Sequence, residues 1–314
     1  MTAPLDFLVL MRRRLRESGV SFALTSGMAC VHFGLQQTTK DSDWIIDPDH
    51  LGGFRRLLGS FKIGGAPGRA SYRPIFGAPL DPAWMAHGWT SHVSVQDEPG
   101  SPGHHVDVFS RPPRVSRVEV EPGDEDFASR HIVAQMKKTD RAKDWPLVDG
   151  LGWQLAVLER PDSLLHLQDP VKLREVWERT GTPLREALAQ RRPLLRKLDA
   201  ETDLDRLHGF VRLERLIWEC VNEDRWGTFL RAWKEFYRRW RDEAGWEWPT
   251  AEPFFEQHER LTDAARRHAL CTDPLGQITR DVIIETGLRR AATRALQPRE
   301  LVLEVAPPAS ELLP

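Results

Sequence analysis

The chain has 314 residues, a formal net charge of −2 at neutral pH and 40% hydrophobic residues, which is ample for a globular core. The near-neutral charge excludes a large basic field over the whole molecule, so nucleotide or nucleic-acid binding would have to come from local patches. The three cysteines, at positions 30, 220 and 271, are odd in number and far apart, which argues against both a disulfide framework and a Cys-x-x-Cys zinc site.

The N-terminal sequence and the hydropathy predict a cytoplasmic protein. The first residues place apolar side chains before a basic run, which is the reverse of the order in a signal peptide. No apolar segment approaches the roughly 20 residues that are needed to span a bilayer. We therefore expect no membrane association, and we expect reduced cysteines.

The first 47 residues predict a helix followed by a strand, a short helix and a second strand. Apolar residues recur at helical spacing over 4–18. The apolar run 21–26 predicts a buried strand. Ser26, the last residue of this run, and Gly27 begin a helix of about two turns, and Gly34 marks its end. The sequence "DSDWIID" (41–47) then predicts the second strand.

The next hundred residues predict a helix, a long excursion and a hairpin. Residues 50–60 have helical periodicity, whereas 63–90 are rich in glycine and proline. The stretches 90–96 and 104–110 both alternate polar and apolar residues, and turn residues separate them, so we expect an antiparallel hairpin. Residues 127–144 then predict one helix, with Pro146 just past its end.

From about residue 150 to 297 almost every segment has helical periodicity, while the tail after residue 300 shows no pattern. The pattern predicts an α+β fold, with a small mixed sheet and flanking helices, followed by an all-helical domain. We expect the catalytic domain at 1–150, the helical domain at 151–300 and a flexible tail at 301–314. The predicted helices of the second half are 151–159, 163–168, 170–179, 183–198, 204–222, 224–243, 254–271 and 274–296.

Two aspartates at the head of an apolar strand are the first candidate site. Residues i and i+2 of a strand project to the same face, so Asp41 and Asp43 point together. Two like charges this close raise each other's pKa unless a cation intervenes. Asp107 lies in the later alternating strand and faces the same pocket if the two strands are neighbours. Three converging carboxylates would suit one or two Mg²⁺ ions. The alternative is that Asp41 and Asp43 cap a turn and pair with Lys40 or an arginine.

The turn at Ser26 and Gly27 is the second candidate. It begins a helix, where free backbone N–H groups and the helix dipole attract phosphate. Gly27 has no side chain, so a phosphate can approach the backbone closely. The following helix and strand bring the aspartates back beside this turn.

This order of elements and motifs resembles the nucleotidyltransferase superfamily related to DNA polymerase beta, over roughly residues 20–145. The apolar strand, the small-residue turn, the short helix, "TKDSD" and the later apolar-Asp-apolar strand carry the resemblance. Its bacterial members include antibiotic nucleotidyltransferases and abortive-infection-type toxins. The turn reads Ser-Gly here, where the family more often has Gly-Gly or Gly-Ser.

The resemblance implies a bacterial, ATP-binding-type transferase that moves a nucleoside monophosphate from a nucleoside triphosphate to an acceptor. It implies that Asp41, Asp43 and Asp107 are the catalytic metal ligands and that Ser26 and Gly27 bind phosphate. The acceptor stays open between an RNA end, a protein hydroxyl and a small molecule, and an antitoxin partner is a further expectation. The alternative of a different class is a nucleotide-binding or regulatory module that kept the fold and lost the chemistry.

Two helical segments carry further candidates. In "MKKTDRAKDW" we expect Lys137, Arg141 and Asp144 on one stripe of a helix, where the two cations would neutralise a triphosphate; Lys143 belongs to the same motif. The alternative is a solvated face with an internal Arg141–Asp144 pair. Aromatic residues repeat at three and four over 226–240, which predicts a buried stripe; a platform that stacks nucleobases is the alternative.

Overall fold

A computed structural model describes residues 4–60, 62–63, 66–67, 69–96 and 103–314. The chain divides into two compact units, each built from stretches that are distant in sequence. Unit 1 comprises residues 1–112, 120–128 and 229–274, and unit 2 comprises residues 113–119, 129–228 and 275–314. The contiguous domains expected from the sequence stay a prediction.

The predicted mixed α+β class is confirmed, and unit 1 holds one mixed seven-stranded sheet with the strand order β5-β6-β7-β2-β1-β9-β8. Its strands pair antiparallel except at β2–β7 and β1–β9, which are parallel. Two further short strands, β3 and β4, form a separate ladder. The strands are β1 (Phe22–Thr25), β2 (Asp41–Ile46), β3 (Lys62–Ile63), β4 (Ala66–Pro67), β5 (Arg69–Tyr72), β6 (Thr90–Gln96), β7 (His104–Phe109), β8 (Val120–Glu121) and β9 (Asp124–Ala128).

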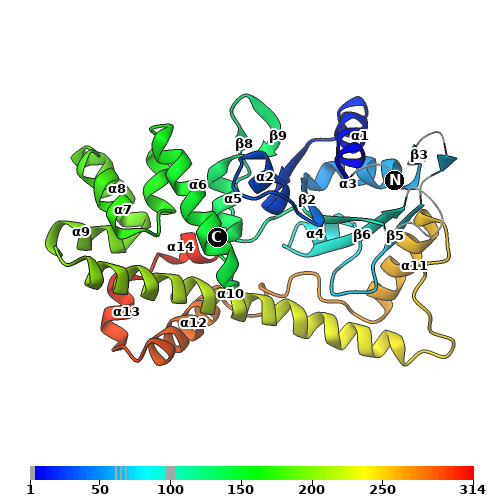
Figure 1. Ribbon diagram of the computed structural model, residues 1–314. Coiled ribbons are helices and arrows are strands. Elements are labelled where there is room, and N and C mark those ends of the chain that lie inside the picture. Colours follow the sequence, from blue (N-terminus) through cyan, green and yellow to red (C-terminus); the bar gives the residue numbers. More distant parts are fainter. Residues whose placement is uncertain (1–3, 61, 64–65, 68, 97–102) are drawn as a thin grey trace. The chain divides into compact units, whose positions relative to one another are not determined.

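Helices α1 and α3 lie on one side of this sheet, and α11 lies beside its edge strand β5 (Figure 1). The buried Gln257 of α11 closes that edge, because its side-chain oxygen accepts from the backbone N–H of Tyr72 at 2.9 Å. The helices of unit 1, apart from the end of α10, are α1 (Pro4–Glu17), α2 (Ser26–His32), α3 (Leu51–Gly59), α4 (Pro82–Met85) and α11 (Phe254–Arg267), with the 3-10 turn η1 (Pro48–His50).

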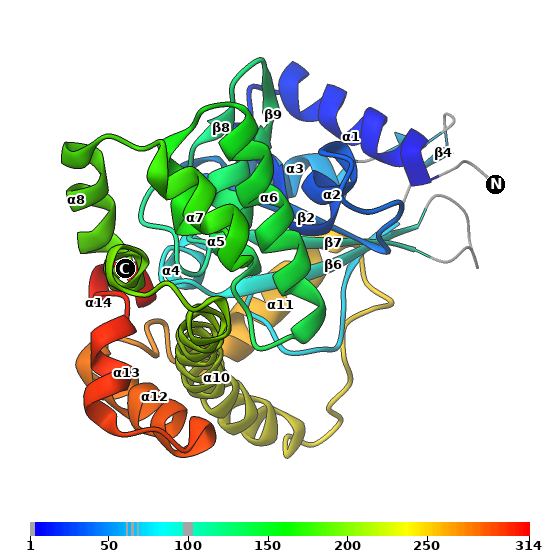
Figure 2. The same cartoon turned by 60° about the vertical axis from the view of Figure 1, so that its left-hand side comes forward.

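Unit 2 is helical and buries its own apolar core, which includes Leu164, Leu173, Ile217 and Val302. Figure 2 shows α12 and α13 beside the first part of α10. The helices are α5 (Arg130–Lys137), α6 (Trp145–Val157), α7 (Pro170–Glu178), α8 (Thr182–Arg191), α9 (Lys197–Ala200), α10 (Leu204–Arg241), α12 (Arg280–Ala295), α13 (Arg299–Val305) and α14 (Ala309–Leu312). Three 3-10 turns accompany them: η2 (Ala142–Asp144), η3 (Pro161–Leu165) and η4 (Pro193–Arg196).

Several expectations about the elements were wrong. The single helix expected over 183–198 is α8, which ends at Arg191, followed by η4 and α9. Residues 127–144 are not one helix, because β9 runs to Ala128 and α5 ends at Lys137. The excursion 63–90 contains β5, which belongs to the main sheet. The two helices expected over 204–243 are the single helix α10. The tail forms α13 and α14, whose apolar side chains Val302 and Leu312 are buried.

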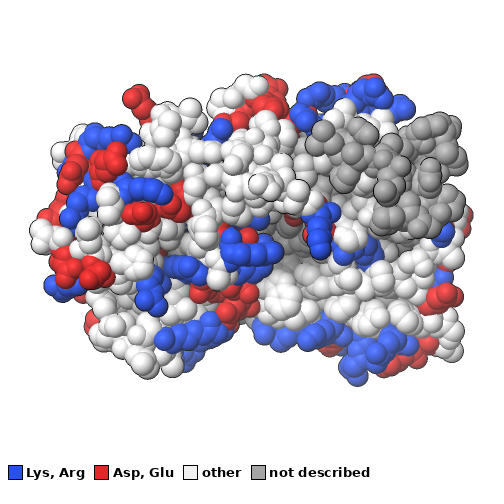
Figure 3. Space-filling model, in the orientation of Figure 1, with Lys and Arg blue, Asp and Glu red and all other residues white. Residues whose placement is uncertain are grey.

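Charged side chains of both signs occur on the surface. Figure 3 shows lysine and arginine side chains interspersed with aspartate and glutamate on the face that it presents. Among the helices of the described residues, none combines the length and the apolarity that crossing a bilayer requires.

Candidate active site

Neighbouring parallel strands bring the three predicted carboxylates onto one face of the sheet. Strand β2 pairs with β7 in parallel, and Asp43 stands directly opposite Asp107. Residues opposite each other on paired strands project to the same side, as do residues two apart on one strand. Asp41, Asp43 and Asp107 therefore share a face, which confirms the expected adjacency of the two strands.

This carboxylate face is partly open to solvent, whereas the opposite face is buried. Along β2 the residues Ser42, Trp44 and Ile46 of the opposite face are buried, while Asp41 and Asp43 are half-buried; Ile45, which follows them on the carboxylate face, is buried. The side chain of Asp41 is 47% exposed and that of Asp107 is 17% exposed. The charged groups thus avoid the full cost of desolvation.

The buried serine between the aspartates explains how β2 begins beside β7. The Ser42 hydroxyl donates to the backbone carbonyl of His105 at 2.8 Å, and it accepts from the indole N–H of Trp44 at 2.9 Å. Both polar groups are satisfied inside the core, as buried polar groups need to be. The hydrogen bonds fix the register that places Asp43 opposite Asp107.

The small-residue turn lies next to the carboxylates, because Thr25 at the end of β1 stands opposite Asp43. Ser26 follows with a positive φ of 52°, an uncommon conformation for a residue with a side chain. A Cβ atom on Gly27 would lie 2.5 Å from the Thr39 hydroxyl, and Gln36 donates to the Gly27 carbonyl at 2.9 Å. The structure thus explains the glycine by the close return of the chain, and phosphate binding by Ser26 and Gly27 stays a prediction.

Two histidines form hydrogen bonds with the carboxylates of Asp41 and Asp107. The Nδ1 atom of His92 lies 2.6 Å from an Asp107 oxygen, and Nδ1 of His105 lies 2.8 Å from an Asp41 oxygen. Arg73 approaches the same Asp107 oxygen at 3.6 Å. The alternation of β7 places His105 on the face of Asp107, whereas sequence reasoning missed His92 and Arg73. The alternation of β6 predicts the face of His92, but its partner depends on the register of the hairpin.

The donor set of this face fits Mg²⁺. Carboxylate oxygens are the ligands that this ion prefers, and it usually takes one or two protein carboxylates together with substrate phosphates. Asp43 and Asp107 are adjacent across the strands, and Asp41 follows on the same face. Across the described residues, no group of three or more His, Cys, Asp or Glu side chains is gathered as a ready metal site.

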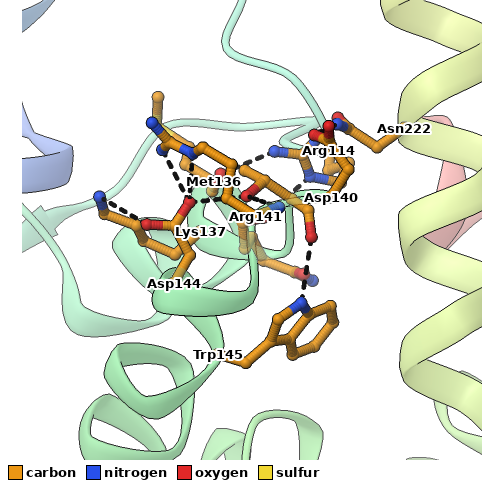
Figure 4. A network of polar contacts seen from close by, with 10 residues as sticks. Arg114, Met136, Lys137, Asp140, Arg141, Asp144, Trp145 and Asn222 are labelled. Carbon is orange, nitrogen blue, oxygen red and sulfur yellow. Dashed lines mark hydrogen bonds and ion pairs between the residues drawn. The ribbon is translucent and has the colours of Figure 1, made fainter. Parts of the chain in front are cut away.

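The predicted cations Lys137 and Arg141 belong to unit 2, where both contact Asp144 (Figure 4). An Asp144 carboxylate oxygen lies 2.8 Å from Arg141 Nε, and the other lies 3.5 Å from Lys137 Nζ. Asp144 also accepts from the hydroxyl of Thr139 at 2.6 Å. The expected single helical stripe was wrong, because a turn separates Lys137 from Arg141. The side chains of Lys137 and Asp144 are only 7% and 2% exposed, so the pair is buried.

The buried side chain of Arg114 contacts the last turn of α5, next to this cluster. Arg114 has a positive φ of 60°, and its guanidinium donates to the carbonyls of Gln135 and Met136 at 3.0 and 2.7 Å. These carbonyls lie in the last turn of α5, where backbone acceptors lack helical partners. Arg114 also donates to the Asn222 side chain (Figure 4). Burial lowers the pKa of Arg114 to about 9, and the nearby Arg225 adds to this shift.

The aromatic stripe of α10 is largely packed within unit 1. Phe229, Phe236 and Trp240 are each 2% exposed. Trp233 stacks on Tyr237 with ring centroids 4.7 Å apart. The buried rings agree with the packing interpretation, whereas Trp226, at the start of the predicted stripe, is 48% exposed.

Comparison with known proteins found no match: no family model, no curated protein and no solved structure is similar to this chain. The carboxylate face is therefore the feature of the molecule from which a function can be proposed. The resemblance to the nucleotidyltransferase superfamily stays a prediction from the motifs.

Proposed function

We propose that the protein is a Mg²⁺-dependent nucleotidyltransferase that moves a nucleoside monophosphate from a nucleoside triphosphate to an acceptor and releases pyrophosphate. One observation carries the proposal: Asp43 stands opposite Asp107 on parallel strands, with Asp41 on the same half-exposed face. The turn that begins α2 follows the residue opposite Asp43. The carboxylates and the turn that we propose to bind phosphate are thus close together in unit 1.

The residues on this face would divide the work of metal binding. Asp41 and Asp43 would hold the ion or ions that contact the triphosphate, and Asp107 would complete the site on the acceptor side. When bound, Mg²⁺ would supply charge neutralisation for the phosphates and would lower the pKa of the acceptor hydroxyl.

Proton and charge handling would fall to neighbouring side chains. Asp107 would accept the proton of the attacking hydroxyl, because a carboxylate within hydrogen-bond reach is a suitable general base. His92 contacts one Asp107 oxygen at 2.6 Å and leaves the other oxygen for this role. Ser26 and the backbone of Gly27 would bind the departing phosphates, and Lys137 and Arg141 stay proposed phosphate ligands.

The direct test is pyrophosphate release from each of the four nucleoside triphosphates with Mg²⁺. The variant Asp107→Asn should lose transfer, since it removes the carboxylate charge and keeps the shape of the side chain. Asp263→Asn, on the exposed surface of α11, is the matched control and should retain full turnover. If the Asp107 variant turned over at the wild-type rate, the metal assignment would be wrong.

A second candidate is a nucleotide-binding or regulatory module without chemistry. The observation in its favour is that Asp41 and Asp107 are already hydrogen-bonded to imidazoles. Calorimetric titration with each Mg²⁺-triphosphate separates the candidates, because a module of this kind would release heat of binding without forming pyrophosphate.

The acceptor is proposed only by class: an RNA end, a protein hydroxyl or a small alcohol. Incubation with each labelled triphosphate and a cell extract would show which fraction takes up the label. An antitoxin partner would be recognised as a protein that abolishes this labelling when it is co-purified with the chain.

A further inference from the structure

An open groove of about 730 Å³ runs along the first part of α10 in unit 2. Its other wall is the end of α12 and the start of the segment that includes α13. The residues that line it are Arg206, Gly209, Phe210, Arg212, Leu213, Arg215, Leu216, Glu219, Arg294, Ala295, Gln297 and Leu301. The lining combines apolar side chains with four arginines. Three of these arginines already form ion pairs, with Glu201, Glu219 and Glu223.

The charge along this face of α10 changes sign over a short distance. The exposed Asp205 lies in the first turn of the helix, whereas the exposed Arg212 lies two turns later. Among the described residues, Asp205 and Arg212 have neither an ion pair nor a side-chain hydrogen bond. Arg206, between them, is occupied by Glu201 at 3.1 Å.

Gly209 lies at the midpoint of this charge pattern. Glycine is a poor helix residue, yet here it is exposed in the body of α10. A Cβ atom on Gly209 would meet no atom within 4 Å, so no described part of the chain requires its small size. A glycine with an open flank permits another backbone to approach closely.

Leu296 adds an apolar anchor beside the groove. It is 90% exposed and has a φ of 52° at the C-cap of α12, a position that glycine usually takes. Its neighbours Ala295 and Gln297 line the groove. Covering this side chain with a second protein surface would remove its apolar area from water.

We infer that the face of α10 beside this groove pairs with the same face of a second copy of the chain, with the two α10 helices antiparallel and crossing near Gly209. Asp205 and Arg212 are four and three residues from Gly209, so an antiparallel crossing there sets Asp205 of each copy against Arg212 of the other. A two-fold interface requires such self-complementarity, and a surface whose charge reverses about one point provides it.

The test is the molar mass of the full chain in solution, measured by sedimentation velocity at micromolar concentration. The wild type should sediment as two chains of 36.0 kDa. Asp205→Arg and Arg212→Glu should each weaken the dimer by on the order of tenfold or more, because each opposes like charges twice in the interface. The double variant carrying both changes should recover the dimer, since the exchanged pairs are again opposite in sign.

Two further variants separate the interface from folding. Gly209→Leu introduces a good helix former at an exposed position, and its side chain fills the crossing point. The variant should therefore be monomeric, with an unchanged or raised melting temperature. Leu296→Asp should also be monomeric, whereas the control Val157→Asp, at a 66% exposed position on α6, should remain dimeric. A monomeric wild type, or a dimer that survives both Gly209→Leu and Arg212→Glu, overturns the inference.

Discussion

Acid should destabilise unit 1 through His258, a residue of α11 beside the edge of the sheet. Tyr72 is fully buried and accepts a hydrogen bond from the backbone N–H of Leu80 at 3.2 Å. Its hydroxyl lies 2.8 Å from His258 Nδ1, so the hydroxyl proton is directed at that nitrogen. Nδ1 is therefore an acceptor, which requires a neutral imidazole.

The magnitude follows from the pKa of His258, which is lowered from 6.5 to about 4. Burial is the main cause, and Arg55 and Arg266 add to it, whereas Asp81 opposes it. The folded pKa is below the unfolded value, so the unfolded chain binds more protons between these two pH values. Stability is complete above pH 6.5 and falls as the pH drops toward 4, by about 3 kcal/mol in total.

Urea unfolding at half-unit pH intervals between 7 and 4 would measure this loss. The pKa of His131 and His166 is also lowered by burial, so the wild-type curve contains their contributions as well. The difference between the wild type and His258→Gln isolates the residue. That difference should change by about 1.4 kcal/mol per pH unit within the window. Parallel curves for the two proteins would refute the assignment of a neutral acceptor histidine.

Three other predictions concern separate parts of the chain. Asp43→Asn should abolish pyrophosphate release while the far-UV circular dichroism stays that of the wild type; retained turnover would exclude Asp43 as a metal ligand. Glu214→Leu should lower the free energy of unfolding by about 3–5 kcal/mol, because it leaves Arg192, 3% exposed and paired at 2.7 Å, as an uncompensated buried charge; an unchanged urea midpoint would contradict this. Gly152→Ala should lower it by about 1–3 kcal/mol despite a better helix propensity, because the added Cβ would lie 2.8 Å from the Leu167 backbone nitrogen, and a raised melting temperature would show that α6 moves freely.

Residues that mark turns and helix ends made the first strands predictable. Ser26 and Gly27 mark the start of α2, and Gly34, with a φ of 72°, follows its end. Both signals act within a few residues, so the sequence alone suffices to find them. The alternation of the two hairpin strands is equally local, and their antiparallel pairing was confirmed.

Long-range pairing explains the elements that the sequence did not show. Phe127 belongs to a strand because it pairs in parallel with Leu24, about a hundred residues earlier. Helical periodicity carries no information on such a partner. The polar stretch near residue 223 looked like a break between two helices, yet α10 continues through it. Glu223 and Asp224 there form ion pairs with Arg290 and Arg294 of α12, which satisfy the charges without ending the helix.

The carboxylates of the candidate site were predictable, but their partners were not. Spacing placed Asp41 and Asp43 together, and the apolar neighbours of Asp107 marked it as a strand residue. The contact of His92 with Asp107 depends on the hairpin register, which the length of the connection between the strands sets. A single sequence does not determine that register.

Unit 1 combines an early and a late part of the chain, which the ribosome synthesises at different times. The edge strand β5 is made early, but Gln257, which closes it, and Phe254, which stacks on Tyr72 at 5.1 Å, come from residues 229–274. Strand β5 therefore leaves the exit tunnel with an unpaired edge, and about 180 residues separate its end from the start of α11, which covers that edge. Unpaired edges recruit other strands, so the chain is most open to aggregation in this interval.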